Sequence, residues 1–485
     1  MDEPKPTLRS TLRPHQVRVF DKLKASGGVV AAHQMGSGKT LTAIAAGVNS
    51  GLPMDVVVPA PLVPNFQKEV QQHVSGVLPH RVRSYEGAAR DATDGNWLRS
   101  NHLVVFDEAH RLRNAGTQRT QLLAHPARNA KMRLLLTGSP IYNNVSDLAP
   151  LINVAAGKAV LPEDPTEFRR RFVQEREVPP GFVGRLLGVK PGIEHSVKNR
   201  AELVRAMAGR VDLHTGDTEH FPSVQHETIE VPMSAGQHRV YQYHLGKVPF
   251  HVRWKIRNGL PPSKQESQSL NAFMGGVRQT SLSPRPYVSG MTDEEEATHT
   301  PKIQEAARRL VSHMRSDPNF RGVVYSNYLG SGLHPYSRAL TAAGVPHTVF
   351  TGEVAPKDRG RLVQDYNEGR TPVMLVSSAG TEGLDLKGTK LIQALEPHFN
   401  EEKIKQLVGR GARYRSHAHL PEAERNVRFE RYVTSMPQRN AVMRALLGQP
   451  RSAEQYIFDR ARDKDRLARQ FQDVLRDAHE APFAG

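Results

Sequence analysis

The 485-residue sequence has no cysteine, which excludes disulfide bonds and thiolate metal sites. It has no apolar run of membrane-spanning length and no secretory signal, so we expect a soluble, intracellular protein without a membrane partner. Acidic residues are comparatively few: 49 Asp and Glu stand against 66 Lys and Arg, a net charge of +17. Because basic side chains release counterions when they neutralise phosphates, this excess favours a nucleic-acid partner. The length indicates two or three domains.

The histidines of the chain do not form a metal-binding pattern. The chain has 22 histidines, but their spacing matches no set of metal ligands. We expect His417 and His419, in the run RSHAH, to lie on the surface as polar residues.

A phosphate-binding loop is the clearest motif that is present. Residues 28–40 read GVVAAHQMGSGKT, in which Val29–Ala32 is an apolar run typical of a buried strand and Gly38 opens a helix. A strand, a Gly-rich turn and a helix N-terminus together direct backbone N–H groups and the positive end of the helix dipole at an anion. The complete pattern has a glycine five residues before Gly38, and His33 stands in its place.

This loop predicts a site for ATP and Mg²⁺. Lys39 is expected to reach the β- and γ-phosphates, and the Thr40 hydroxyl is expected to hold the metal. Gln16 ends a loop just before the preceding helix, and its amide can both donate to and accept from adenine. The nucleotide-binding residues predicted in this part of the chain are Gln16, Gly36, Ser37, Gly38, Lys39 and Thr40.

Two adjacent carboxylates follow another apolar run. Residues 103–110 read LVVFDEAH, which places Asp107 and Glu108 at the carboxyl end of a buried strand. We predict that Asp107 binds Mg²⁺ through water and that Glu108 orients and deprotonates the attacking water. His110 is expected to sense the state of the nucleotide.

Two further strand ends belong to the same half of the chain. The apolar run DVVV leads into the turn PAPLVPNF, whose backbone N–H groups suit a nucleic-acid phosphate, with Pro59 and Asn65 as predicted contacts. Residues 133–144, RLLLTGSPIYNN, predict another buried strand. Thr137 and Ser139 at its end are expected to couple the γ-phosphate state to the rest of the lobe.

Taken in order, the phosphate loop, PAPLVPNF, DEAH and LLLTGSPIYNN resemble the superfamily 2 nucleic-acid motors, and specifically their Swi/Snf-type branch. The runs MSAGQ at 233–237 and VRQT at 277–280 are similar to the link between the lobes of that branch. The resemblance implies an α/β fold of two tandem RecA-like lobes, each a parallel sheet flanked by helices. A helical or irregular insertion lies between them, and a helix follows them.

The second half of the chain carries the motifs expected of the second lobe. Alternating strands and helices return from Lys302, without a second phosphate loop. Residues 377–386, SSAGTEGLDL, and 406–413, QLVGRGAR, match the fifth and sixth helicase motifs. Arg410 and Arg413 are predicted to stabilise charge on the transferring γ-phosphate, because a guanidinium is planar and always charged. The resemblance implies three more nucleotide-binding residues: Gly383, Asp385 and Gln406.

Two features differ from the chromatin-remodelling motors of this branch. The fifth motif reads EGLDL instead of GLGINL, and the sixth is followed by YRSHAHLP. The run RSHAHLP, with a strand after it, resembles nucleoside triphosphatases of large DNA viruses, of the poxvirus nucleoside triphosphatase I and early transcription factor type. In that type a histidine often replaces the first glycine of the phosphate loop, and His33 occupies that position in this chain. A viral or phage origin is therefore expected.

The resemblance implies that nucleic acid is contacted mainly through its phosphodiester backbone. The expected contacts lie at strand ends of both lobes: Pro59, Asn65, Asn327, Thr351, Ser377 and Thr381. Three functions fit: a DNA-stimulated ATPase that translocates on duplex DNA, a strand-separating helicase on DNA or RNA, and a nucleotide-dependent scaffold in a viral transcription, replication or packaging complex. We expect a monomeric motor.

The predicted domains are a first lobe at 1–157, a helical insertion at 158–225, an inter-lobe link with the helical part of the second lobe at 226–300, a second lobe at 301–450 and a C-terminal helix at 451–485 packed on the motor. The stretch 281–301, with its acidic run Asp293–Glu296, is expected to be an exposed linker. Ser452 begins a capping box. The helix after it carries an apolar stripe made of Ile457, Ala461, Leu467, Phe471, Val474, Leu475 and Ala478.

Overall fold

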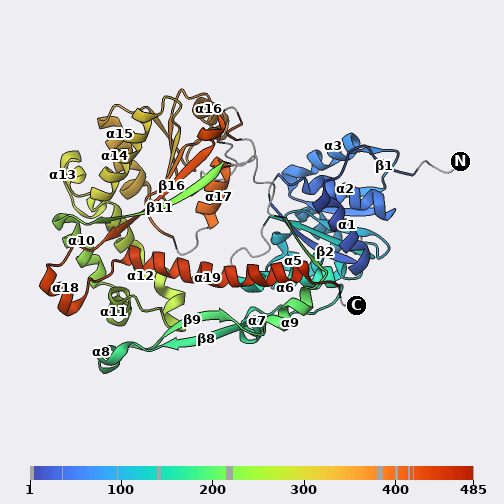
Figure 1. Ribbon diagram of the computed structural model, residues 1–485, viewed down its shortest axis with the longest axis horizontal. Coiled ribbons are helices and arrows are strands. Elements are labelled where there is room, and N and C mark those ends of the chain that lie inside the picture. The colour runs from blue at the N-terminus through green and yellow to red at the C-terminus, as the bar shows by residue number, and fades with distance from the viewer. Residues whose placement is uncertain are drawn as a thin grey trace. The chain divides into compact units, whose positions relative to one another are not determined.

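A computed structural model describes residues 5–34, 36–95, 97–138, 144–214, 222–378, 386–398, 402–412, 416–418 and 420–483. The chain divides into two compact units (Figure 1). Unit 1 comprises residues 1–175, 195–216 and 465–485, and unit 2 comprises residues 176–194 and 217–464. Each unit contains one six-stranded sheet whose neighbouring strands all run parallel. The predicted fold class, two tandem α/β lobes with parallel sheets, is confirmed.

The sheet of unit 1 has the strand order β10-β2-β7-β6-β3-β5. Its strands are β2 (Gly28–His33), β3 (Met54–Val58), β5 (His80–Ser84), β6 (Leu103–Phe106), β7 (Met132–Thr137) and β10 (Val211–His214). Helices cover both faces, so the central strands are near-continuous apolar runs. In β6, Val104 and Phe106 join the core on one face, while Leu103 and Val105 join the core on the other.

Helices surround this sheet on both sides (Figure 1). They are α1 (Pro14–Ser26), α2 (Lys39–Ser50), α3 (Val63–His73), α4 (Tyr85–Thr93), α5 (Gln118–Ala127), α6 (Leu148–Ala156), α7 (Pro165–Phe172) and α9 (Arg200–Met207). Short strands β1 (Thr7–Leu8) and β4 (Val74–Ser75) form a separate pair. Because all strands of the main sheet are parallel, the loops that follow their carboxyl ends meet at one edge.

The sheet of unit 2 has the order β11-β16-β15-β12-β14-β13. Its strands are β11 (Ser223–Pro232), β12 (Gly322–Tyr325), β13 (His347–Phe350), β14 (Val373–Val376), β15 (Leu391–Ala394) and β16 (Asn426–Ser435). The helices are α10 (Ala235–Gly246), α11 (Phe250–Asn258), α12 (Lys264–Leu282), α13 (Asp293–Thr298), α14 (Pro301–Ser316), α15 (His334–Ala342), α16 (Pro356–Asn367), α17 (Glu402–Gly411) and α18 (Ala441–Leu447). The strands β8 (Val173–Val178) and β9 (Gly192–Val197) pair with each other, and α8 (Gly181–Leu186) lies between them in the chain.

The stretch between the two predicted lobes contributes strands to both sheets. Residues 158–225, expected as a helical insertion, include β10, which pairs with β2 in the first sheet. Strand β11, expected in the link, pairs with β16 over ten residues in the second sheet. These pairings could not be predicted, because partner strands this distant in the chain leave no local sequence pattern.

Two surface predictions are wrong. The acidic run Asp293–Glu296 forms α13, not an exposed linker, and Glu296 is only 2% exposed. Arg285, Arg338 and the Ser283 hydroxyl all bind the Glu296 carboxylate, so its charge is compensated inside the unit.

His417 is likewise buried, not on the surface. Its Nε2 lies 2.8 Å from the Thr389 carbonyl, and its Nδ1 lies 2.9 Å from the Ser416 hydroxyl. These two partners satisfy the polar atoms of the ring. His419 lies outside the described residues.

The last helix, α19 (Ala453–Glu480), begins as predicted with a capping box. Gln455 N–H donates to the Ser452 hydroxyl at 3.1 Å, and Ser452 N–H donates to Gln455 Oε1 at 2.9 Å. Ile457 joins a core of unit 2, whereas Phe471 and Val474 join a core of unit 1. The apolar stripe of this one helix is therefore used by both units. None of the helices in the described ranges combines the length and the apolarity that a bilayer span needs.

Candidate nucleotide site

The phosphate loop connects β2 to α2 as predicted. Gly36 and Gly38 have φ angles of 82° and 78°, in the left-handed region that glycine adopts without steric cost. A Cβ placed on Gly38 would lie 2.7 Å from the side-chain amide nitrogen of Gln16, so a larger residue would displace that amide as well as strain the left-handed backbone. Met35 lies outside the described residues.

The loop presents donors that have few partners inside the protein. Ser37 is 5% exposed, and its hydroxyl is buried without a hydrogen-bond partner in the described part of the chain. The Lys39 ammonium donates to the His33 carbonyl at 3.1 Å, and Thr40 lies beside it in the first turn of α2. An unsatisfied buried hydroxyl costs about 1–3 kcal/mol, which a phosphate oxygen would recover.

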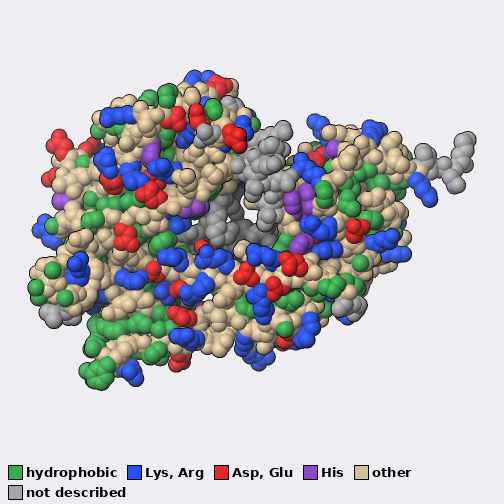
Figure 2. Space-filling view, in the orientation of Figure 1, with side chains coloured by type: hydrophobic (Ala, Val, Ile, Leu, Met, Phe, Trp, Pro, Cys, Tyr) green, Lys and Arg blue, Asp and Glu red, His purple; other side chains and the backbone are tan. Residues whose placement is uncertain are grey.

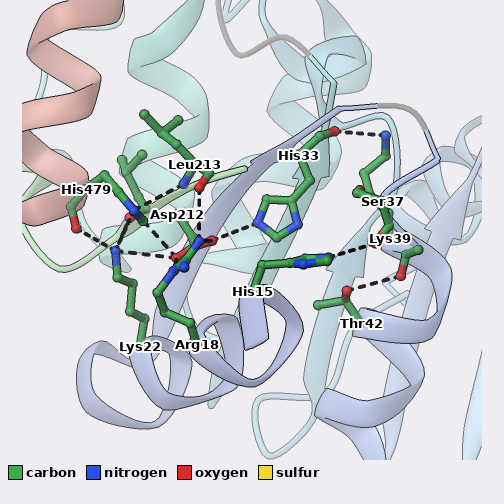
Figure 3. A network of polar contacts seen from close by, with 12 residues as sticks. His15, Arg18, Lys22, His33, Ser37, Lys39, Thr42, Asp212, Leu213 and His479 are labelled. Atoms are coloured by element: carbon green, nitrogen blue, oxygen red, sulfur yellow. Dashed lines mark hydrogen bonds and ion pairs between the residues drawn. The ribbon is translucent and has the colours of Figure 1, made fainter. Parts of the chain in front are cut away.

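Two side chains of α1 form hydrogen bonds with the loop, and Figure 3 shows one of them, His15. His15 Nε2 lies 2.9 Å from the Ser37 carbonyl, which only accepts, so this nitrogen donates. Gln16 Nε2 donates to the Gly38 carbonyl at 3.1 Å, and Gln16 Oε1 accepts from Arg13 N–H at 2.9 Å. In the structure, Gln16 therefore supports the loop through hydrogen bonds. Its contact with adenine stays a prediction.

The acid pair directly follows β6. Asp107 is 7% exposed and accepts, through Oδ1, the N–H of Glu108 at 2.9 Å. Glu108 itself has a φ of 50°, in the left-handed region that non-glycine residues rarely adopt. Such a conformation costs about 1–3 kcal/mol and is concentrated at functional sites. Among the described residues, Asn199 is the one other non-glycine with positive φ.

The two carboxylates differ in their pKa. Burial, and after it the charge of Glu108, raise the pKa of Asp107 to about 6, while the charge of Lys39 lowers it. Burial also raises the pKa of Glu108, but the hydrogen bond from His110 and the charge of Lys39 lower it more, to below its usual value. His110 Nδ1 lies 3.3 Å from Glu108 Oε2. Glu108 is therefore ionised at neutral pH and able to accept a proton.

The site fits Mg²⁺ by the chemistry of its donors. Thr40 and Asp107 offer a hydroxyl and a carboxylate, the hard oxygen ligands that Mg²⁺ prefers. Burial is the main cause of the raised pKa of Asp107, and a bound cation would stabilise its ionised form. No group of three or more His, Cys, Asp or Glu suited to a metal occurs among the described residues.

The predicted coupling residues lie at the same edge of the sheet. His110 contacts Glu108, as described above, from the short helix Ala109–Leu112. Thr137 is buried at the end of β7 and pairs in register with Ala32 of β2. A Cβ on the next residue, Gly138, would lie 3.9 Å from the Lys39 ammonium. The structure thus brings Thr137 beside the phosphate loop, while Ser139 lies outside the described residues.

The nucleotide residues predicted in unit 2 centre on α17. Arg410 lies in the last turn of this helix, which packs through buried Ile404 and Leu407. A Cβ on Gly411 would lie 2.9 Å from Ile392 of β15, so the helix end is pressed against the sheet. Gln406 lies on the same helix. The remaining predicted residues, Arg413, Gly383 and Asp385, lie outside the described part of the chain.

The predicted nucleic-acid contacts differ in exposure. Asn65 and Asn327 are exposed, whereas Pro59 is buried. Thr351 and Ser377 are 5% and 6% exposed, at the ends of two adjacent strands of unit 2. Thr381 lies outside the described residues. Contact with nucleic acid stays a prediction for all of them.

Asp212 of β10 is a charged residue at this site that sequence reasoning missed. It is fully buried, and its carboxylate lies 2.8 Å from His33 Nε2 and 2.6 Å from Arg18 Nε (Figure 3). Burial raises the pKa of Asp212, but the hydrogen bonds from His33 and Arg18 lower it far more, so the group is ionised. An acid within the short apolar run VDLH was the available signal, because a buried charge needs partners.

Two protein families match the chain. Residues 81–285 match the SNF2-related domain, and residues 305–415 match the helicase conserved C-terminal domain. The first match includes the acid pair but begins after the phosphate loop, and the second includes α17. Together the two matches draw on both units.

Individual proteins are similar over nearly the whole chain. A putative ATP-dependent RNA helicase of Acanthamoeba polyphaga mimivirus is 27% identical over 475 residues, covering 96% of this chain and 97% of the relative. A termination factor NPH-I homolog of African swine fever virus is 23% identical over 567 residues, covering 94% and 77%. The solved Sulfolobus solfataricus SWI2/SNF2 ATPase core in complex with dsDNA aligns over 99% of both chains, at 15% identity and a TM-score of 0.35.

Proposed function

Since the chain belongs to the superfamily 2 ATPases of the Swi/Snf type, which are ATP-dependent nucleic-acid motors, we propose that it is a DNA-stimulated ATPase that translocates on duplex DNA. The family matches and the viral relatives confirm the resemblance that the motifs predicted. One observation carries the proposal for the site. At one edge of the first sheet, Lys39 lies close enough to Asp107 and Glu108 for its charge to lower the pKa of both.

The residues of unit 1 would bind the nucleotide and prepare the attacking water. The Ser37 hydroxyl, the loop N–H groups and Lys39 hold the phosphates, as the unpartnered hydroxyl and the left-handed glycines allow. Thr40 and Asp107 would hold Mg²⁺, which when bound neutralises charge on the β- and γ-phosphates. Glu108, ionised and oriented by its contact with His110, takes a proton from the attacking water at its carboxylate oxygen.

Unit 2 would complete the reaction. Arg410 and Arg413 stabilise charge that develops on the γ-phosphate, so hydrolysis requires both units to act together. DNA bound across both units would favour this arrangement and thereby stimulate hydrolysis. Repeated closure and release would move the protein along one strand.

The charge of the protein supports binding to a phosphate backbone. On the face shown in Figure 2, Lys and Arg side chains lie among Asp and Glu side chains over both units and do not gather in a single patch. On this face the basic side chains are thus spread over many positions. Binding through dispersed phosphate contacts weakens steeply with salt and carries little base specificity.

The test is the nucleic-acid dependence of the ATPase rate. Purified protein is given duplex DNA, single-stranded DNA or RNA, and the same preparations are assayed for triplex displacement and for strand displacement. We expect duplex DNA to stimulate hydrolysis, with triplex displacement but no unwinding. Stimulation by RNA alone would sink the duplex-DNA proposal.

A strand-separating helicase is the second candidate, because the mimivirus relative is named an RNA helicase and the chain carries DEAH. Strand displacement in the same assay would favour it. A scaffold in a viral transcription complex is the third, since another relative is named a termination factor. ATP binding without stimulation by any of the three polymers would favour that function.

A further inference from the structure

We propose that Asp212 and His33 act as a positioning pair for the phosphate loop, and that the pair also ties the end of helix α19 to the nucleotide site. The inference rests on the proposed ATPase function, whose site it deepens. We assign neither residue a contact with the nucleotide; in this proposal both act through the loop. The pair joins strands β10 and β2, which are neighbours in the first sheet.

Asp212 is held by opposite charges in a buried place. Its exposure is 0%, and its two oxygens bind Arg18 at 2.6 Å and His33 at 2.8 Å, while the Lys22 ammonium lies at 3.5 Å. A fully buried carboxylate is tolerated only with such partners. The orientation of the His33 ring is therefore fixed by a group that cannot itself move without exposing an unpaired charge.

His33 connects this carboxylate to the loop in two ways. The His33 carbonyl accepts a hydrogen bond from the Lys39 ammonium at 3.1 Å. The backbone position of His33 therefore helps to place that ammonium. Its ring packs edge-on against His15, with centroids 5.4 Å apart, and His15 donates to the Ser37 carbonyl. Figure 3 shows these residues in sequence from Asp212 to the loop.

The rings of three histidines form one layer beneath the loop. His15 stacks on His214 with centroids 3.7 Å apart, and His33 meets His214 edge-on at 5.6 Å. A glycine at position 33, the residue of the complete motif, would leave the space of the His33 ring empty. We infer that the imidazole layer replaces close glycine packing as the support of this phosphate loop. Burial lowers the pKa of His15, and the neighbouring His33 lowers it further, which favours the neutral form of His15.

Lys22 links the Asp212 carboxylate to the C-terminal helix. Lys22, which lies beside Asp212, donates to the His479 carbonyl at 2.7 Å and lies 2.9 Å from His479 Nδ1. His479 belongs to the last turn of α19, where free carbonyls and the negative end of the helix dipole favour a cation. The part of α19 that packs on unit 1 is therefore linked through Lys22 and Asp212 to the support of the loop.

The chain supplies a matched control in Asp55. This residue is 1% exposed and binds Arg81 Nε at 2.8 Å and His102 Nδ1 at 2.7 Å, so it repeats the Asp–Arg–His set of Asp212. It lies near the amino end of β3 in the same sheet, away from the edge that carries the phosphate loop. Loss of either carboxylate charge leaves a partly exposed arginine and a buried histidine without their acid.

The experiment compares Asp212→Asn with Asp55→Asn in the full chain, by steady-state ATP hydrolysis and by thermal unfolding. We expect both to lower the unfolding temperature. Asp212→Asn is expected to raise the KM for ATP about tenfold, as loss of a supporting partner typically does, with little change in kcat. Asp55→Asn is expected to leave both kinetic constants within about twofold. Equal kinetic changes in the two variants, or none, would overturn the proposal.

His33→Ala keeps the test decisive if Asp212→Asn does not fold, because it leaves Asp212 paired with Arg18 and Lys22. It is expected to raise the KM for ATP to a similar extent, and adding Asp212→Asn to it is expected to change the KM no further. An unchanged KM in His33→Ala, or independent and additive effects, would contradict the positioning role. If the unaltered chain hydrolyses no ATP, the proposed function itself fails, which is a distinct result.

Discussion

The two sheets have the same number of parallel strands, but the donors at their carboxyl edges differ. Those of unit 1 include one without a partner in the described part of the chain, whereas those of unit 2 bind a carboxylate of the protein. In unit 1, β2 leads into a loop that presents Lys39 and the unpartnered Ser37 hydroxyl. In unit 2, the residues that follow β12 donate to a carboxylate of the protein itself. Asn327 N–H and the Ser326 hydroxyl donate to the two oxygens of Glu396, at 2.7 and 2.8 Å.

Glu396 is fully buried and follows the end of β15, beside β12. Burial raises its pKa, but the hydrogen bond from His398 and the N–H of Asn327 lower it more, so the group is ionised. An ionised carboxylate at this edge repels a phosphate and occupies the donors that a phosphate would use. The comparison teaches that the same sheet architecture presents open donors to an anion only where its loops leave them unpaired, and we propose that unit 2 contributes to the nucleotide site through α17 instead.

The strongest test of this division of labour is Arg410→Ala. Loss of an arginine that stabilises the transferring phosphoryl group is expected to reduce kcat about 1,000-fold while ATP binding is retained. Turnover and ATP affinity are measured separately. Arg308→Ala, at an exposed arginine of α14, is the matched control and should hydrolyse ATP normally. Normal turnover in Arg410→Ala would show that unit 2 does not complete the site.

Glu108→Gln tests the other side of the comparison. Removal of the general base is expected to lower kcat about 100-fold or more, with ATP binding intact, because Gln keeps the shape but accepts no proton. Single-turnover hydrolysis and ATP binding measure the two effects. Glu86→Gln, at a half-exposed acid of α4, is the control. If Glu108→Gln hydrolyses ATP as fast as the unaltered chain, the assignment of the base is wrong.

Glu396→Gln has a smaller expected effect, on stability. The variant weakens hydrogen bonds from buried donors to a charged acceptor, which is worth about 1.5–3 kcal/mol. We expect a lower unfolding temperature of unit 2 and an unchanged KM for ATP in the absence of nucleic acid. A changed KM would mean that this edge takes part in nucleotide binding after all.

The two edges should also respond to acid in different pH ranges, which is the smallest of these effects. The pKa of His15 lies below its usual 6.5, so below about pH 6.5 the unfolded chain binds the proton first and folding stability is lost. The pKa of Glu396 lies below its usual 4.5, so its contribution is present above about pH 4.5 and is lost as the pH falls further. Unfolding free energies measured from pH 7 to 3 should therefore show a shallower slope between pH 7 and 5 in His15→Gln, and below pH 4.5 in Glu396→Gln. Unaltered slopes would contradict these assignments.

What the sequence predicted well is encoded locally. The strand–loop–helix at 28–40 and the strand with its acids at 103–110 each lie within a short run, where apolar pattern and glycine spacing suffice. What it missed depends on pairing across the chain. Asp212 and His33 are 179 positions apart, and Ser326 and Glu396 are 70 apart. The acidic run of α13 was also misread, because only the fold brings Arg338 to Glu296.

The most direct measurement of the central claim is the ATPase rate of the unaltered chain as duplex DNA is added. If unit 1 binds ATP and unit 2 completes the site when DNA spans both, the rate rises with duplex DNA until it saturates. Because the contacts are made to phosphates, added salt should shift this rise to higher DNA concentrations. An ATPase rate that neither DNA nor RNA changes would contradict the account.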